Sequence, residues 1–202
     1  MTLYRGRLPH VYETKQPVFL TWRLHGSLPA SRHFPGGSLS SGQAFAVLDR
    51  LLDEACSGPV YLRQPALAEL VVDAIHYNGQ VLGQYTLHAF VVMPNHVHVL
   101  ITPRVPLPTL TKSLKGITAK QANAILGRTG APFWQKESYD RDVRDEREFE
   151  RIRFYIERNP LRAGLAQEAS QYRWSSAGWA TLGSPVDEAS TLRIAENEDR
   201  VA

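Results

Sequence analysis

The sequence contains a single cysteine, Cys56, so it can form no internal disulfide and no metal cluster bound by its own thiolates. It also lacks any apolar run approaching the ~20 residues that a membrane-spanning helix needs. The first ten residues, MTLYRGRLPH, have no apolar signal-peptide core, and we expect the protein to remain in the cytoplasm. The sequence also has little excess of one charge over the other. Its formal net charge of +3 permits a nucleic-acid partner without requiring one.

Alternating and helical apolar periods follow one another along the chain. They predict a strand at residues 17–24, helices at 41–56 and 65–79, and a hairpin at 84–103. A helix at 107–127, a short extended segment at 133–144 and a last helix at 145–160 follow. This order is typical of an α+β fold, in which helices cover an antiparallel sheet. We expect one domain over residues 1–178, followed by a flexible polar tail over residues 179–202.

The last predicted helix has a recognisable beginning and end. Asp145 is followed three residues later by Glu148, which is the spacing of a capping box. Pro160 is expected to close the helix, because proline cannot continue the backbone hydrogen bonding. The apolar stripe of Phe149, Ile152 and Ile156 gives this helix one buried face.

The predicted hairpin includes the segment VVMPNHVHVL, residues 91–100. Its turn is Pro94-Asn95, and His96 and His98 follow directly. Residues two apart on a strand point to the same face, so the two imidazoles project together. They are then either satisfied core histidines or half of a metal site, since neutral imidazole is a common metal ligand.

The segment FYIERNP in the last helix contains a second pair of polar side chains. Tyr155 and Asn159 are four residues apart and therefore lie on the same helix face. Periodicity alone is compatible with a packed tyrosine and an asparagine near the helix end. The amide oxygen of Asn159 could instead be a third ligand for a hard divalent cation, with the phenol of Tyr155 beside it.

These motifs occur in an order that resembles a known family. MPNHVHVL, then FWQKESYDRDVRDEREFERIRFYIERNPLRAGL, then YRWSSA are similar to the single-tyrosine HUH transposases, and most of all to the REP-associated tyrosine transposases. The N-terminal GRLPH and FLTWRLHGSLP fit the same branch, so the resemblance covers roughly residues 5–177. It implies a ferredoxin-like (RRM-like) central antiparallel sheet covered by helices, with a C-terminal catalytic helix.

The resemblance also implies a chemistry. Tyr155 would be the nucleophile, and His96, His98 and Asn159 would bind Mg²⁺ or Mn²⁺. The enzyme would cleave and rejoin single-stranded, hairpin-forming DNA through a 5′-phosphotyrosine intermediate. A divalent ion would polarise the scissile phosphate. Mobile relatives use glutamine where this chain has the shorter Asn159, which leaves open whether the amide binds the ion directly or through water.

Other family features concern the DNA and the assembly. The resemblance implies that Arg5, Arg7 and His10 reach DNA, because family members use the N-terminal segment to recognise bases beside a hairpin. The expected partner is single-stranded DNA with palindromic repeats. Mobile relatives are dimers, whereas the REP-associated branch favours a monomer; a homodimer remains open.

The spacing of three lysines gives a separate expectation about DNA. Lys112, Lys115 and Lys120 recur at near-helical spacing and could form a basic stripe against phosphates, or merely a solvated helix face.

Three alternatives are open at this point. Tyr139 is a rival nucleophile, although Val143 stands where its amide partner would be. A domesticated relative could bind structured DNA without cutting it. A metal-dependent hydrolase of another substrate is disfavoured by the lack of a carboxylate on the hairpin at residues 91–103.

Overall fold

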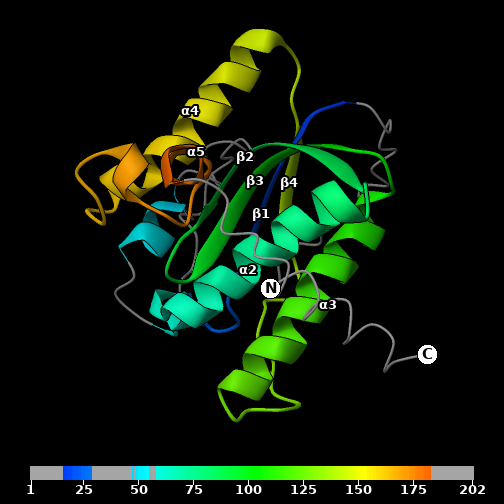
Figure 1. Cartoon of the computed structure of the whole chain (residues 1–202), viewed down its shortest axis with the longest axis vertical. Coiled ribbons are helices and arrows are strands. Elements are labelled where there is room, and N and C mark those ends of the chain that lie inside the picture. Colours follow the sequence, from blue (N-terminus) through cyan, green and yellow to red (C-terminus); the bar gives the residue numbers. More distant parts are fainter. Residues whose placement is uncertain (1–15, 29–46, 48, 55–57, 183–202) are drawn as a thin grey trace, which may run out of the picture.

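The computed structural model describes residues 16–28, 47, 49–54 and 58–182 (Figure 1). Several sequence predictions therefore lie outside the described residues. These are the helix start near residue 41, Cys56, the tail from residue 183 and the N-terminal DNA contacts Arg5, Arg7 and His10.

A four-stranded antiparallel sheet forms the centre of the fold (Figure 1). Its order is β2-β3-β1-β4, which is the ferredoxin-like order, so the predicted α+β class is confirmed. The strands are β1 (Val18–Arg23), β2 (Tyr85–Val92), β3 (His96–Pro103) and β4 (Tyr139–Asp142). The central strand β1 pairs with both β3 and β4, and it is almost wholly buried because both of its faces are covered.

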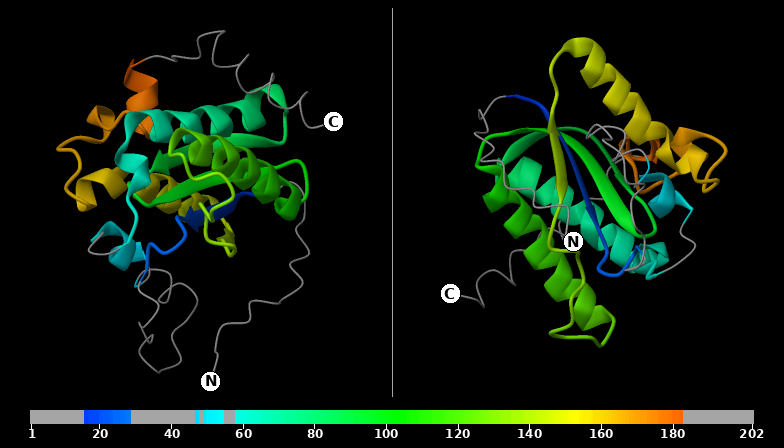
Figure 2. Two further views of the ribbon diagram at one scale, coloured as in Figure 1. Left: turned by 90° about the horizontal axis from the view of Figure 1, so that it is seen from below. Right: turned by 180° about the vertical axis from the view of Figure 1, so that it is seen from behind.

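Two helices, α2 (Pro65–His76) and α3 (Leu107–Ile125), cover one face of the sheet and lie side by side (Figures 1 and 2). The core on this side contains Val18, Leu20 and Trp22 of β1. The prediction of one helix over residues 65–79 was only partly right, because the chain widens into a π-helical turn, η2 (Tyr77–Val81). Asn78 is part of the reason: its side-chain amide donates to Ala74 O at 2.8 Å and so binds a carbonyl of the preceding turn.

The other face of the sheet packs against α4 (Glu146–Arg162). Asp145 is its N-cap as predicted, and its carboxylate accepts a hydrogen bond from Glu148 N–H at 2.7 Å. The prediction that Pro160 closes the helix was wrong, since α4 continues to Arg162. Proline costs the helix only one hydrogen bond so near its end, and Gly164, at φ +67°, ends the turn in the left-handed region.

The remaining described elements are short. The extended segment predicted over residues 133–144 is a strand only at β4, with an isolated bridge between Leu24 and Trp134. Two 3-10 turns, η1 (Tyr61–Arg63) and η3 (Ala169–Gln171), precede α2 and α5 (Ser176–Leu182). Helix α5 crosses residue 178, where the sequence suggested a domain end. Among the described residues, no helix is long and apolar enough to cross a membrane.

Candidate metal centre and nucleophile

The histidine pair stands at the start of β3, directly after the hairpin turn. Met93 N–H donates to His96 O at 2.8 Å, which closes the turn around Pro94-Asn95. His96 and His98 are both fully buried and lie on the sheet face covered by α4. Their Nε2 atoms are 3.1 Å apart, so the two imidazoles meet at one point, as the i, i+2 spacing predicts.

The other nitrogen of each ring is held by a polar side chain. His96 Nδ1 lies 2.6 Å from Asn95 Oδ1, and Asn95 donates its own amide N–H to Leu52 O at 3.0 Å. His98 Nδ1 lies 2.7 Å from Thr21 Oγ1. With its N–H groups directed at Leu52, Asn95 presents oxygen to His96, which favours a proton on Nδ1 and a lone pair on Nε2.

Electrostatics keeps the first histidine neutral. Burial, and then the neighbouring His98, lower the pKa of His96 to about 3. A neutral imidazole with a free lone pair is the form that binds a metal ion.

A carboxylate that sequence reasoning missed completes this group. Asp49 belongs to the helical residues 49–53 and is 1% exposed. Its Oδ1 lies 3.0 Å from His98 Nε2 and 3.7 Å from His96 Nε2. The three residues can each offer one ligand atom within 4.8 Å of the others. Two imidazoles and a carboxylate are a donor set that fits a divalent cation.

The charges around Asp49 favour its ionised form. Burial alone would raise the pKa of this carboxyl, but His98, through its charge and a hydrogen bond, and Arg162 hold that pKa below its usual range. The second acid of the helix, Asp53, behaves in the opposite way. Burial and the charge of Asp49 raise its pKa to about 7, and its carboxylate lies 3.8 Å from His96 Nε2 and 3.6 Å from Arg162 Nη2.

Tyr155 of α4 reaches the same carboxylate. Its hydroxyl donates a hydrogen bond to Asp49 Oδ2, while Oδ1 of that group faces the imidazoles. Its ring lies edge-on to Phe19 at a centroid distance of 6.2 Å and is 5.9 Å from the His98 ring. The guanidinium of Arg162 lies 4.9 Å from the centre of the tyrosine ring. The predicted phenol and the predicted histidines are thus brought together within one chain.

Asn159 lies one helical turn beyond Tyr155 and is fully buried. Neither its amide oxygen nor its amide nitrogen has a hydrogen-bond partner among the described residues. A buried amide without a partner costs about 1–3 kcal/mol, so such groups are rare in folded proteins. The unpaired amide fits a residue that serves a ligand, as the sequence predicts for the third metal-binding position.

Comparison with known proteins agrees with this geometry. A family model described as "Transposase IS200 like" matches residues 71–159, a segment that contains His96, His98, Tyr155 and Asn159. Residues 71–159 are thus similar to the IS200-like transposases. The resemblance predicted from the motifs is thereby confirmed. Asp49 and Asp53 precede the matched segment.

A solved structure shows a similar fold. The chain is similar to a REP-associated tyrosine transposase bound to a REP hairpin, with a TM-score of 0.53, 17% identity, and coverage of 87% of this chain and 82% of that one. A Deinococcus radiodurans protein assigned as a transposase is 22% identical over 79% of this chain and 98% of that one. Its TM-score of 0.36 does not establish a shared fold. A search of curated proteins found no significant match.

The rival tyrosine lies on the same sheet face as the histidine pair. Tyr139 is on β4, opposite Thr21, and its ring lies edge-on to Phe19 at 6.3 Å. It is thus one aromatic ring away from Tyr155.

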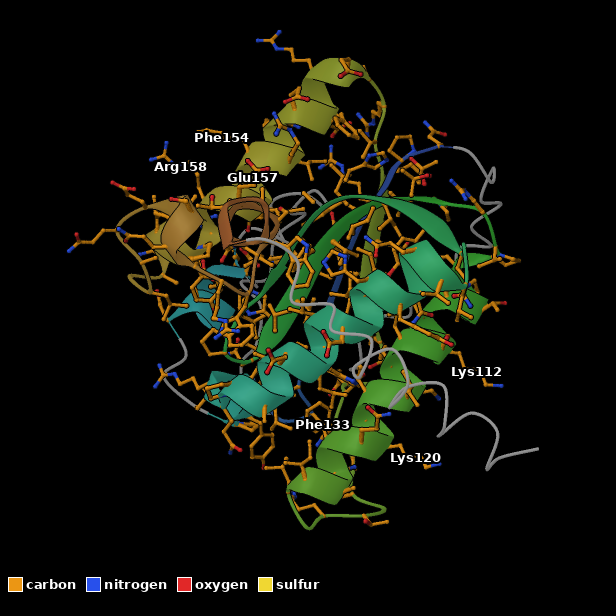
Figure 3. The ribbon with its side chains drawn as sticks, in the orientation of Figure 1. Lys112, Lys120, Phe133, Phe154, Glu157 and Arg158 are labelled. Carbon is orange, nitrogen blue, oxygen red and sulfur yellow. The ribbon has the colours of Figure 1, made fainter. Side chains whose placement is uncertain are left out.

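The three predicted DNA-binding lysines lie on α3, which covers the opposite face of the sheet from the histidines. Lys112 and Lys120 are exposed and point outward from the helix (Figure 3). Lys115 is turned toward the segment before β4 and donates to Gln135 O, Lys136 O and Ser138 Oγ. Burial lowers the pKa of Lys115 to about 8. The structure therefore does not bring these lysines to the histidine pair, and their contact with DNA stays a prediction.

The carboxylates were hidden by their sequence context. Asp49 and Asp53 are four residues apart in LDRLLDE, and an acid on a helix is ordinarily solvated. The only sequence signal that these acids belong to the site was their position on one helix face. Which face of residues 49–53 is buried depends on packing against distant strands. The argument against a hydrolase from a missing carboxylate was therefore wrong, because the acid comes from a separate helix rather than from the hairpin.

Proposed function

We propose that the protein is a metal-dependent tyrosine transposase that cleaves and rejoins single-stranded, hairpin-forming DNA through a 5′-phosphotyrosine intermediate. One observation carries this proposal: the Tyr155 hydroxyl is hydrogen-bonded to the carboxylate of Asp49 that also faces His96 and His98. A phenol held beside a cation site is the arrangement that metal-assisted nucleophilic attack on a phosphodiester requires.

His96 and His98 would hold the metal ion together with Asp49 Oδ1, and Asn159 would serve it directly or through water. When bound, a divalent ion supplies charge that polarises the scissile phosphate. We propose Mg²⁺ or Mn²⁺, because a set of carboxylate, amide and phosphate oxygens suits these hard ions. The two imidazole nitrogens favour Mn²⁺ of the pair.

The reaction exchanges one ester for another. The Tyr155 oxygen forms a bond to phosphorus, and the bond from phosphorus to the 3′ oxygen breaks. The phenol proton passes along its hydrogen bond to Asp49, which releases it to solvent, and the departing 3′ oxygen takes up a proton from water to end as a hydroxyl. Attack by a second 3′-hydroxyl on the phosphotyrosine releases Tyr155 and joins the strands, so no external energy source is needed.

Arg162 would assist by its position. Its guanidinium lies near both the Tyr155 ring and the Asp53 carboxylate, so a fixed positive charge faces the place where negative charge develops. Because Tyr155 meets the histidines of its own chain, a monomer is sufficient for this chemistry. We propose a single transposase domain over residues 1–178, acting on DNA in the cytoplasm, with the N-terminal Arg5, Arg7 and His10 among its DNA contacts.

The test uses purified protein and a labelled single-stranded palindromic oligonucleotide from the flanks of the host gene. With Mn²⁺ or Mg²⁺ we expect a covalent protein–DNA adduct that resists denaturing electrophoresis. Tyr155→Phe abolishes the adduct, whereas the matched variant Tyr139→Phe retains it. Hairpin binding without any adduct, unaffected by His96→Ala, would instead indicate a DNA-binding protein that does not cut.

A further inference from the structure

A second polar feature lies at the other end of α4. A hollow of about 640 Å³ opens between the end of β4 and the first turns of α4. Figure 1 shows that these turns project beyond the sheet and that β4 leads up to them. Four of its six lining residues are arginines, with Arg141, Arg144, Asp145, Arg147, Glu148 and Arg151 forming its wall.

Glu148 forms ion pairs with two of the arginines. Its side chain is nearly buried and forms ion pairs with Arg141 of β4 and with Arg151, the latter at 3.3 Å. The backbone N–H of Arg144 donates to the same carboxylate at 3.0 Å. The acid thus fixes one arginine from the strand and one from the helix at the rim of one hollow.

The other two arginines have no acidic partner in the part of the chain that the structure describes. The guanidinium groups of Arg144 and Arg147 are exposed and form no ion pair or hydrogen bond with the residues that the structure describes. The second acid, Asp145, is engaged as the cap of α4. The lining holds four guanidinium groups against two carboxylates and keeps a net positive charge of two. Such a concave group attracts phosphate, which arginine binds through two parallel hydrogen bonds.

The hollow and the candidate site are reached from the same helix and the same face of the sheet. Arg151 is four residues before Tyr155 on α4, so the two lie on one side of the helix, about 6 Å apart along its axis. Arg141 pairs with Phe19 across the sheet, and the Phe19 ring contacts both Tyr155 and His98. The same sheet face therefore leads from the histidine pair, past Phe19, to the arginines.

We propose that this hollow binds the backbone phosphates of the single strand that extends from the cleavage point, which holds the strand while the phosphotyrosine exists. This proposal rests on the proposed function, because it takes the strand at Tyr155 as its starting point. A single strand fits better than a duplex here, since its flexible backbone can follow a path that bends from the sheet face to the helix tip.

The test measures DNA affinity in the Tyr155→Phe background, so that no cleavage occurs. Three fluorescent oligonucleotides are compared: a hairpin ending at the cleavage point, and the same hairpin continued by single strand beyond that point on its 5′ or its 3′ side. We expect one of the two extensions to raise affinity. The double variant Arg144→Gln, Arg147→Gln should bind that extended oligonucleotide about tenfold more weakly. For two lost phosphate contacts, the slope of log affinity against log salt should fall by about 1.4 on the extended strand alone.

The matched control removes two charges elsewhere. Arg153→Gln with Arg173→Gln, each on an arginine paired with surface glutamates, should leave the effect of the extension unchanged. Equal loss on all three oligonucleotides, or none on either extended one, would overturn the proposal. Adduct formation by the protein with intact Tyr155 is scored separately, so a failed hollow and a failed transposase assignment give different results.

Discussion

The hydroxyl of Tyr155 donates a hydrogen bond to one oxygen of the Asp49 carboxylate, and the other oxygen lies 3.0 Å from His98 Nε2. One carboxylate therefore joins the candidate nucleophile to the candidate metal ligands. Residues 49–53, the hairpin and α4 are distant in sequence, and this contact ties all three together.

Replacing Asp49 with asparagine should weaken both functions of this group. Asparagine keeps the size of the side chain but removes the charge that a cation and the phenol need. We expect Mn²⁺ affinity, measured by isothermal titration calorimetry, to fall about ten- to a hundredfold, and the rate of adduct formation to fall about a hundredfold or more. Asp142→Asn, at an exposed position of β4, is the control, and equal Mn²⁺ affinity in both variants would exclude Asp49 as a ligand.

The histidine pair predicts a thermal response to metal. A ligand that binds only the folded state at 100 times its Kd stabilises a protein by about 2.7 kcal/mol. Mn²⁺ should therefore raise the melting temperature of the wild-type protein but not that of the His96→Ala or His98→Ala variant. His88→Gln is the comparison, because His88 is also a strand histidine but bonds to Thr102 at 2.7 Å. A metal-induced rise that survives both alanine variants would contradict the assignment.

Asn159 should behave unlike other buried asparagines. In Asn159→Ala the loss of packing destabilises the fold, whereas removal of a buried amide without a partner among the described residues stabilises it. The two contributions nearly cancel, so the free energy of unfolding without metal should change by less than about 1 kcal/mol. Mn²⁺ affinity should fall about tenfold. Asn78→Ala breaks bonds to Ala74 and Ser113, and should cost about 1–3 kcal/mol without affecting metal affinity. The opposite pattern would make Asn159 a packing residue.

His76 predicts a loss of stability in acid. It lies stacked on Trp179 at a centroid distance of 4.1 Å, and burial lowers its pKa from 6.5 to about 4. The unfolded chain then takes up a proton before the folded chain does. Stability from this group is therefore present above pH 6.5 and is lost as pH falls toward 4, by up to about 3 kcal/mol.

His76→Phe keeps the stacking and removes the titration. Urea unfolding at pH 7 and pH 4.5 should show a smaller acid loss in this variant than in the wild-type protein. The comparison cancels the contribution of Asp73, whose pKa burial raises to about 6 and which acts in the opposite direction. His25→Gln, at an exposed position, should behave as wild type. An unchanged acid loss in His76→Phe would contradict the prediction.

Local patterns were enough to predict much of the fold and part of the site. The Pro94-Asn95 turn and the period of the strand place His96 and His98 on one face, and helical spacing places Tyr155 with Asn159. Each of these relations is set by neighbours within a few residues, so it can be found in the sequence.

The relations that could not be predicted depend on packing between distant segments. Asp49 is a metal-site candidate only because the helical residues 49–53 turn this side toward β3. Lys115 has the spacing of a DNA-binding stripe, yet it donates to backbone carbonyls of the segment before β4. The side of the sheet that α3 covers, which separates Lys112 and Lys120 from the histidines, is likewise a property of the assembled fold.

Peptide mapping of the covalent adduct tests the role of Tyr155. After reaction with a single-stranded palindromic oligonucleotide and Mn²⁺, the protein is digested with nuclease and trypsin and analysed by mass spectrometry. Cleavage after Arg153 and Arg158 gives the peptide FYIER, residues 154–158, in which Tyr155 is the single tyrosine. We predict a nucleotide mass on this peptide. A nucleotide on ESYDR, residues 137–141, or on no peptide, would contradict the assignment of Tyr155 as the nucleophile.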